Sequence, residues 1–194
     1  MITKLPLLAA SLAVTLLIQG CASAPPSVVK NGEVEFSKDG APLGWAPFAP
    51  AGAEQYAKME WDLDEHRNGT HAVSIEILRT QPQQLSVYMW QGHLEGFKTN
   101  TWYELESYVK AKNLRETAWV EIQCWNRDGK KILATYNSRK TSQILDKREW
   151  EQVKFRFRVP RGTASVVVRA CVNGQTNQGG KVSFDDFKLW SDLR

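Results

Sequence analysis

The sequence of 194 residues contains little of several residue types that mark specialised proteins. Three cysteines are too few for a disulfide-stabilised miniprotein. The three histidines, His66, His71 and His93, show no spacing typical of a catalytic zinc site. The sequence also lacks a glycine-rich phosphate loop, a G-x-S-x-G motif and a long amphipathic helix. These absences argue against catalytic zinc, nucleotide and serine-hydrolase chemistry.

The charge balance excludes a further class of partner. The 25 basic and 21 acidic residues are spread along the chain, so the net charge of +4 does not indicate nucleic-acid binding. A hydrophobic fraction of 42% is typical of a globular protein, and the length favours one domain. Eight tryptophans are unusual, and their positions direct the functional interpretation.

The N-terminal segment has the pattern of an export signal. Lys4 precedes an apolar stretch, residues 5–18, that is too short to span a bilayer. The sequence L-L-I-Q-G-C at residues 16–21 resembles the lipobox of bacterial lipoproteins. That resemblance implies cleavage before Cys21 and acylation, palmitate included, of its thiol and amine. We therefore expect a signal peptide at 1–20, a tether at 21–28 and one domain at 29–194.

An ordinary signal peptide cut after Ala24 is the alternative, although Pro25 would then follow the cut bond. Lipidation implies a protein anchored in the bacterial cell envelope. Ala22 stands where inner-membrane lipoproteins of enteric bacteria carry an aspartate, so the outer membrane is favoured over the inner one.

Hydrophobic residues alternate with period two in five segments, residues 85–90, 102–110, 119–125, 152–159 and 165–172. This period predicts an all-β protein, a β-sandwich whose strands bury one face each. The residues expected inside are Leu85, Val87, Met89, Tyr103, Leu105, Ser107, Val109, Val120, Ile122, Cys124, Val153, Phe155, Phe157, Val159, Val166, Val168, Ala170 and Val172.

The same phase turns an unusual set of side chains outward. The predicted set is aromatic with interleaved polar groups: Tyr56, Glu60, Tyr88, Trp90, Trp119, Glu121, Gln123, Trp125 and Arg169. A soluble monomer rarely exposes so many large rings, so the pattern predicts a ligand-binding surface. The alternative is that loops cover these rings or that some strands are buried on both faces. The phase also places Cys124 inside and Cys171 outside, so we expect these two thiols to be unpaired.

Six segments, in order along the chain, resemble carbohydrate-binding modules of the family 4 and family 9 type. They are N-G-E-V-E at 31–35, G-W at 44–45, N-G-T-H-A-V-S-I at 68–75, Y-E-L-E-S-Y-V-K at 103–110, Trp150 with F-R-V-P at 157–160, and G-K-V-S-F-D-D-F at 180–187. The resemblance implies a galactose-binding-like jelly roll that binds a polysaccharide or oligosaccharide without catalysis. It also places Trp45 beneath a sheet.

The last strand has a phase change that the residues show independently. Val182 and Phe184 are out of phase with Phe187, so a bulge is expected at Asp185-Asp186. Adjacent carboxylates at a bend need a counter-charge. In the resembled family this strand and an N-terminal glutamate hold a structural calcium, which implies Glu35 and Asp185 or Asp186 as ligands. The alternative is an aspartate pair that faces a lysine or arginine.

Two other functions remain open from the sequence. Glu60, Asp62 and Glu65 resemble the E-x-D-x-x-E signature of family 16 glycoside hydrolases, but a plain strand points Glu65 away from Glu60. We therefore expect no enzyme activity. The other alternative is a structural or assembly lipoprotein whose aromatic face binds a protein partner. Nothing in the sequence names the glycan.

Overall fold

The computed structural model describes residues 29–81, 87–146 and 149–192. The expected signal peptide, the tether and Cys21 lie outside these residues. The elements are β1 (Ser37–Lys38), β2 (Ala41–Pro42), β3 (Trp45–Phe48), β4 (Ala57–Asp62), β5 (Ala72–Ile77), β6 (Val87–His93), β7 (Trp102–Lys112), β8 (Trp119–Trp125), β9 (Ile132–Asn137), η1 (Ser138–Lys140), β10 (Glu151–Arg158), β11 (Ser165–Asn173) and β12 (Lys181–Asp192). No helix in this described part is long and apolar enough to cross a membrane.

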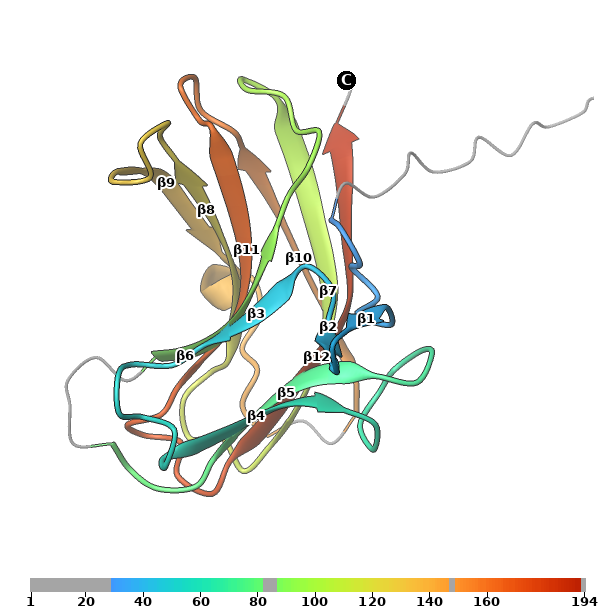
Figure 1. Ribbon diagram of the computed structural model, residues 1–194, viewed down its shortest axis with the longest axis vertical. Coiled ribbons are helices and arrows are strands. Elements are labelled where there is room, and N and C mark those ends of the chain that lie inside the picture. The colour runs from blue at the N-terminus through green and yellow to red at the C-terminus, as the bar shows by residue number, and fades with distance from the viewer. Residues whose placement is uncertain (1–28, 82–86, 147–148, 193–194) are drawn as a thin grey trace, which may run out of the picture.

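The strands form a β-sandwich of two five-stranded antiparallel sheets, as the sequence predicts. Sheet I has the strand order β10-β7-β12-β5-β4, and sheet II has the order β3-β6-β11-β8-β9. Figure 1 shows the two sheets and the separate short β1–β2 pair. One large cluster of buried side chains, drawn from both sheets, lies between them.

The predicted inward residues are correct on β7, β8, β10 and β11. Burial of these apolar side chains contributes roughly 1.5–3 kcal/mol each, the main stabilising term of the fold. The confirmed core residues are Tyr103, Leu105, Val109, Val120, Ile122, Cys124, Val153, Phe155, Phe157, Val159, Val166, Val168, Ala170 and Val172, and Ser107 is buried with them.

β6 has the opposite phase to the one predicted. Tyr88 and Trp90 point into the core, whereas Met89 lies on the outer face of sheet II. The Tyr88 hydroxyl donates to Gln81 Oε1 at 2.6 Å, and Trp90 Nε1 donates to the carbonyl of Ser74 at 3.0 Å. Because their polar atoms are satisfied internally, both rings are stable in the core. The prediction that Tyr88 and Trp90 face a ligand is therefore wrong.

Gly92 explains how β6 accommodates large rings on its inner side. The ring of Trp45 packs against Gly92, where a Cβ atom would lie 3.0 Å from the indole. Trp45 is buried, its Nε1 donates to the carbonyl of Asn31 at 2.9 Å, and its ring centroid is 4.5 Å from that of Phe187. The expected position of Trp45 beneath the sheet is confirmed.

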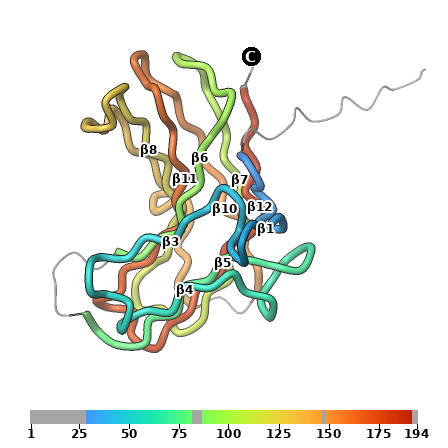
Figure 2. Tube along the Cα trace, in the orientation of Figure 1, coloured from blue at the N-terminus to red at the C-terminus, as the bar shows by residue number. Residues whose placement is uncertain are grey.

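β12 contains the bulge that its sequence predicts. Its register against β7 shifts between Asp185 and Lys188, and Asp186 has a φ of +54°. The bulge lets both Phe184 and Phe187 enter the core. The N-terminal segment covers this point, since Phe187 donates its N–H to the carbonyl of Gly32 at 2.7 Å. Figure 2 shows that segment, in blue, beside the red trace of β12.

Candidate functional site

The outer face of sheet I is rich in ion pairs. Four lysine ammonium groups each lie 2.7 Å from a carboxylate oxygen, and the pairs are Lys58–Glu60, Lys110–Glu65, Lys154–Glu104 and Lys181–Asp62. Asp62 is buried, whereas the other three pairs are at least partly exposed, and pairs of that kind contribute about 0–1 kcal/mol each and are typical of a solvated surface. Much of the charge on this face is therefore matched within the protein.

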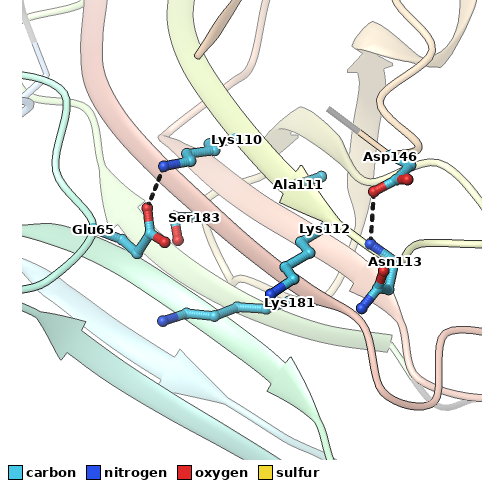
Figure 3. Close-up of a pocket in the computed structure, with 8 residues that line it drawn as sticks. All are labelled: Glu65, Lys110, Ala111, Lys112, Asn113, Asp146, Lys181 and Ser183. Carbon is cyan, nitrogen blue, oxygen red and sulfur yellow. Dashed lines mark hydrogen bonds and ion pairs between the residues drawn. The ribbon is translucent and has the colours of Figure 1, made fainter. Parts of the chain in front are cut away.

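A hollow of about 450 Å³ lies on this face, and Figure 3 shows the residues that line it. Lys110 and Glu65 pair across one side, and Asp146 accepts the backbone N–H of Asn113 at 2.9 Å on the other. The eight lining residues include no aromatic side chain. Because two of the three lining lysines already meet carboxylates, this hollow is a weaker candidate than the outer face of sheet II.

The outer face of sheet II carries a row of polar residues across three adjacent strands. Arg169 on β11 lies directly between Gln91 on β6 and Glu121 on β8 in the strand register. Gln123 is the next outward residue of β8, and Trp125 follows it. These residues share a face because the intervening Val120, Ile122 and Cys124 point into the core.

Hydrogen bonds connect the members of this row. Arg169 Nε donates to Gln91 Oε1 at 3.0 Å, and Arg169 Nη1 lies 3.7 Å from Glu121 Oε1. Gln123 Nε2 donates to the same Glu121 oxygen at 2.8 Å. The Arg169 and Glu121 side chains are 17% and 15% exposed, so the row is fixed in position yet open to contact.

Gln123 leaves one acceptor unused. Gln123 is only 8% exposed, and its Oε1 has no hydrogen-bond partner among the described residues. An unmet buried acceptor costs about 1–3 kcal/mol. This oxygen has almost no accessible surface, so an external ligand reaches the row through its other polar atoms.

Two aromatic residues flank the row with different exposure. Trp125 is partly exposed, whereas Trp119 is 4% exposed and belongs to a small cluster with Met89 and Cys171. The guanidinium carbon of Arg139, in η1, lies 3.5 Å from the Trp119 ring centroid. Arg139 therefore shields Trp119, and Trp125 is the ring of this pair that a ligand can reach directly.

The structure thus brings together five of the nine predicted ligand-binding residues, Trp119, Glu121, Gln123, Trp125 and Arg169. Tyr88 and Trp90 are in the core. Tyr56 packs partly buried against the core just before β4, and Glu60 pairs with Lys58 on sheet I. The predicted single surface is therefore divided, because β4 belongs to the other sheet.

The sequence interpretation missed Gln91 and Arg139. Gln91 could have been found, because Gln91 and His93 are polar while Gly92 and Leu94 are not, which fixes the true phase of β6. No local sequence pattern identifies Arg139 as a site residue, because its contact with Trp119 joins residues that are 20 positions apart across a hairpin.

The expected calcium residues divide into two groups around the loop between β4 and β5. Glu35 accepts the backbone N–H groups of Thr70 and His71, both at 3.0 Å. Burial opposes the ionisation of Glu35, but these hydrogen bonds outweigh it and lower its pKa. Asp185 accepts the backbone N–H of Arg67 at 2.9 Å. Burial raises the pKa of Asp185 to about 6 despite such bonds.

Asp186 has its own counter-charge. Its carboxylate accepts hydrogen bonds from the guanidinium of Arg67 and the amide of Asn68, and Lys188 Nζ lies 3.6 Å away. The guanidinium carbon of Arg67 also lies 3.4 Å from the Tyr108 ring centroid. The groups that face these carboxylates are N–H donors, the Thr70 hydroxyl and the cations Arg67 and Lys188, whereas calcium takes oxygen ligands. This donor set does not fit a calcium ion.

Within residues 29–81, 87–146 and 149–192, no three His, Cys, Asp or Glu side chains are grouped as a metal site would need.

The three acidic residues of the E-x-D-x-x-E segment each form an ion pair with a lysine. Asp62 pairs with Lys181, and although burial opposes its ionisation, the bonds from Lys181 and Asp64 lower its pKa. In the resembled signature the first and last glutamates carry the reaction, and here Glu60 pairs with Lys58 and Glu65 pairs with Lys110, both at 2.7 Å.

Comparisons with known proteins show the fold. No protein-family model and no curated protein matches the sequence. The xylan-binding domain CBM22-1 of Paenibacillus barcinonensis Xyn10C matches with a TM-score of 0.58 and 12% identity, over 87% of this chain and 97% of that one. The module TmCBM61, solved with β-1,4-galactotriose, matches with a TM-score of 0.53 and 14% identity, over 86% and 99%. These neighbours confirm a jelly-roll sandwich.

Enzymes share the fold as well. A cyclase from Fischerella sp. TAU matches with a TM-score of 0.58 and 15% identity, over 86% of this chain and 98% of that one. An arabinose-bound family 51 α-L-arabinofuranosidase and a tailspike domain of bacteriophage CBA120 also match, but this chain spans only 27% and 21% of their lengths. At such identities the comparisons establish the architecture and leave function to the site.

Proposed function

We propose that the protein binds a polysaccharide or oligosaccharide, without catalysis, on the outer face of sheet II. The observation that carries the proposal is the hydrogen-bonded row from Gln91 through Arg169 and Glu121 to Gln123, with Trp125 beside it. Sugars present hydroxyls to such polar groups and C–H-rich faces to aromatic rings. Carbohydrate-binding modules among the structural neighbours support this function.

Trp125→Ala tests the proposal against a matched control. Loss of a binding tryptophan commonly costs about 2 kcal/mol, roughly a thirtyfold loss of affinity. Trp102 on β7 is 46% exposed on the outer face of sheet I, so Trp102→Ala removes the same side chain from the opposite surface. A glycan array identifies the ligand, and calorimetry of both variants then measures affinity.

We expect Trp125→Ala to lose affinity and Trp102→Ala to keep it. If both variants bind like the wild type, the binding face is not on sheet II. If the wild-type domain binds no glycan on the array, carbohydrate binding is overturned, and a protein partner for this face becomes the working hypothesis.

We also propose that this domain is tethered to a bacterial membrane through acylated Cys21, with the outer membrane favoured. The lipobox-like residues 16–21 support this proposal. An extended tether of residues 21–28 reaches at most about 29 Å, so the domain would remain close to the membrane surface.

A further inference from the structure

The five strands of sheet II carry few charged residues, and their charges balance. Its five strands contain one acidic residue, Glu121, and one residue of type Arg or Lys, Arg169. These two lie beside each other, and Glu121 also accepts from Gln123. Helix η1, which contains no acidic residue, then adds Arg139, whose guanidinium lies over the Trp119 ring on the outer face.

Arg139 is held in place while its hydrogen-bonding capacity is unused. Its backbone N–H donates to the Asn137 side chain at 3.2 Å, and its guanidinium carbon lies 3.5 Å from the Trp119 ring centroid. Among the described residues, its side chain has no carboxylate or other hydrogen-bond acceptor as a partner. A guanidinium that rests on a ring keeps its N–H groups for an external anion, which it binds in bidentate geometry.

Arg139 and Arg169 belong to one surface. Both influence Cys171, the outward neighbour of Arg169 on β11 and the cross-strand partner of Trp119. Burial raises the pKa of this thiol well above its ordinary value, Glu121 raises it further, and the two arginines lower it. The acidic Glu116 lies at the end of this face, where it accepts from Asn173 rather than from Arg139.

We infer that the glycan bound on sheet II is anionic, and that its carboxylate or sulfate group is received by the Arg139 guanidinium. This inference rests on the proposed carbohydrate-binding function and specifies its ligand class. Arg169 is less available to an acid group, since Gln91 and Glu121 occupy two of its N–H directions. Its remaining N–H groups suit the neutral hydroxyls of the same chain.

The experiment compares polymers that share a backbone and differ in charge. The chain from residue 22 to 194 retains every described residue and is measured by calorimetry. Polygalacturonate and its methyl-esterified form test the carboxylate, dextran sulfate and dextran test the sulfate, and neutral xylan, glucan and galactan complete the set. We expect at least one acidic polymer to bind roughly tenfold or more tightly than its neutral partner, with the difference falling as salt increases.

Arg139→Gln should remove that preference, so that the acidic and the neutral polymer bind with similar affinity. The control Lys112→Gln removes one positive charge from the outer face of sheet I and should keep the preference, which excludes a general effect of net charge. Binding to neutral polymers alone would overturn the anionic ligand but keep carbohydrate binding. An acidic preference that survives Arg139→Gln would overturn the role of Arg139. Binding to no polymer would overturn the proposed function itself.

Discussion

Trp90 and Trp125 are both in strands of sheet II, yet their environments are opposite. Trp90 is buried and donates to Ser74, whereas Trp125 is partly exposed on the outer face. Truncation of a buried aromatic residue typically costs about 3–5 kcal/mol, because it leaves a cavity. We expect Trp90→Ala to lower the free energy of unfolding by this amount, as measured by urea denaturation.

Trp125→Ala is the matched comparison and should change the free energy of unfolding by less than about 1 kcal/mol. The face assignment of β6 would be contradicted if Trp90→Ala were as stable as the wild type. Equal destabilisation by the two substitutions would instead show that Trp125 is a core residue.

The two described cysteines lie on opposite faces of sheet II, as their predicted phase requires. Cys124 is in the main core, and Cys171 packs with Met89 and Trp119 on the other side. Burial raises the pKa of Cys124 to about 11 and that of Cys171 well above its ordinary value. Thiolates are the reactive form, so both residues should be inert in the folded protein.

A thiol-reactive chromogenic disulfide tests this expectation on the chain from residue 22, which contains no other cysteine. At about pH 8 we expect no rapid reaction before unfolding and two reactive thiols after it in denaturant. Rapid labelling of the native protein would show that one thiol is exposed. Fewer than two thiols after unfolding without reductant would indicate a disulfide.

At the scale of elements, strand phase was predictable wherever one face is clearly apolar. β7 and β10 alternate between apolar and charged residues, so burial can follow only one pattern. β6 is ambiguous over Val87-Tyr88-Met89-Trp90, where both faces are large and hydrophobic. The correct phase follows from Gly92 and Leu94, which lie beyond the alternating segment 85–90.

The bulge in β12 provides the clearest prediction for an element. Arg67 connects the β4–β5 loop to Asp186 and packs on Tyr108, so it supplies the positive charge that this bend requires. We expect Arg67→Ala to lower the free energy of unfolding by roughly 3–5 kcal/mol, because Asp186 is left buried with its charge poorly compensated. Thermal unfolding of the variant measures this loss.

Calcium and a chelator provide the complementary measurement. If Arg67 fulfils the role of a cation, chelation should leave the melting temperature of the wild type unchanged. A ligand that binds the folded state would otherwise stabilise by about 2.7 kcal/mol at a hundredfold excess over its Kd. A reversible fall in melting temperature with chelator, or calcium found by elemental analysis, would contradict this interpretation.

At the scale of the molecule, the sequence predicted the sandwich but only part of its candidate site. Residues on one strand, such as Glu121, Gln123 and Trp125, were grouped correctly because alternation alone places them on one face. Alternation along one strand does not show which strands pair. Tyr56 and Glu60 were therefore predicted on the same surface as Glu121, although β4 belongs to sheet I and β8 to sheet II. Contacts such as Arg139 with Trp119 and Arg67 with Asp186 depend on loops that only the folded chain positions.

The last prediction concerns the attachment of the whole domain. The buried core of the described part is built from residues between Val29 and Leu189, and the proposed anchor at Cys21 acts through its acyl chains. Cys21→Ser should therefore release the protein from the membrane fraction and leave both its melting temperature and its glycan affinity unchanged. Each buried methylene of an acyl chain contributes about 0.8 kcal/mol to membrane binding, so loss of every chain should abolish the proposed attachment.

Detergent-phase partitioning and mass spectrometry of the N-terminus measure the change. The wild type should begin at Cys21, carry acyl chains and enter the detergent phase, whereas the variant should remain in the aqueous phase. A wild-type chain that begins at Pro25 without lipid would show that an ordinary signal peptide is removed. Membrane retention of the Cys21→Ser variant would place the attachment in another part of the chain, and the domain would then need a membrane contact of its own.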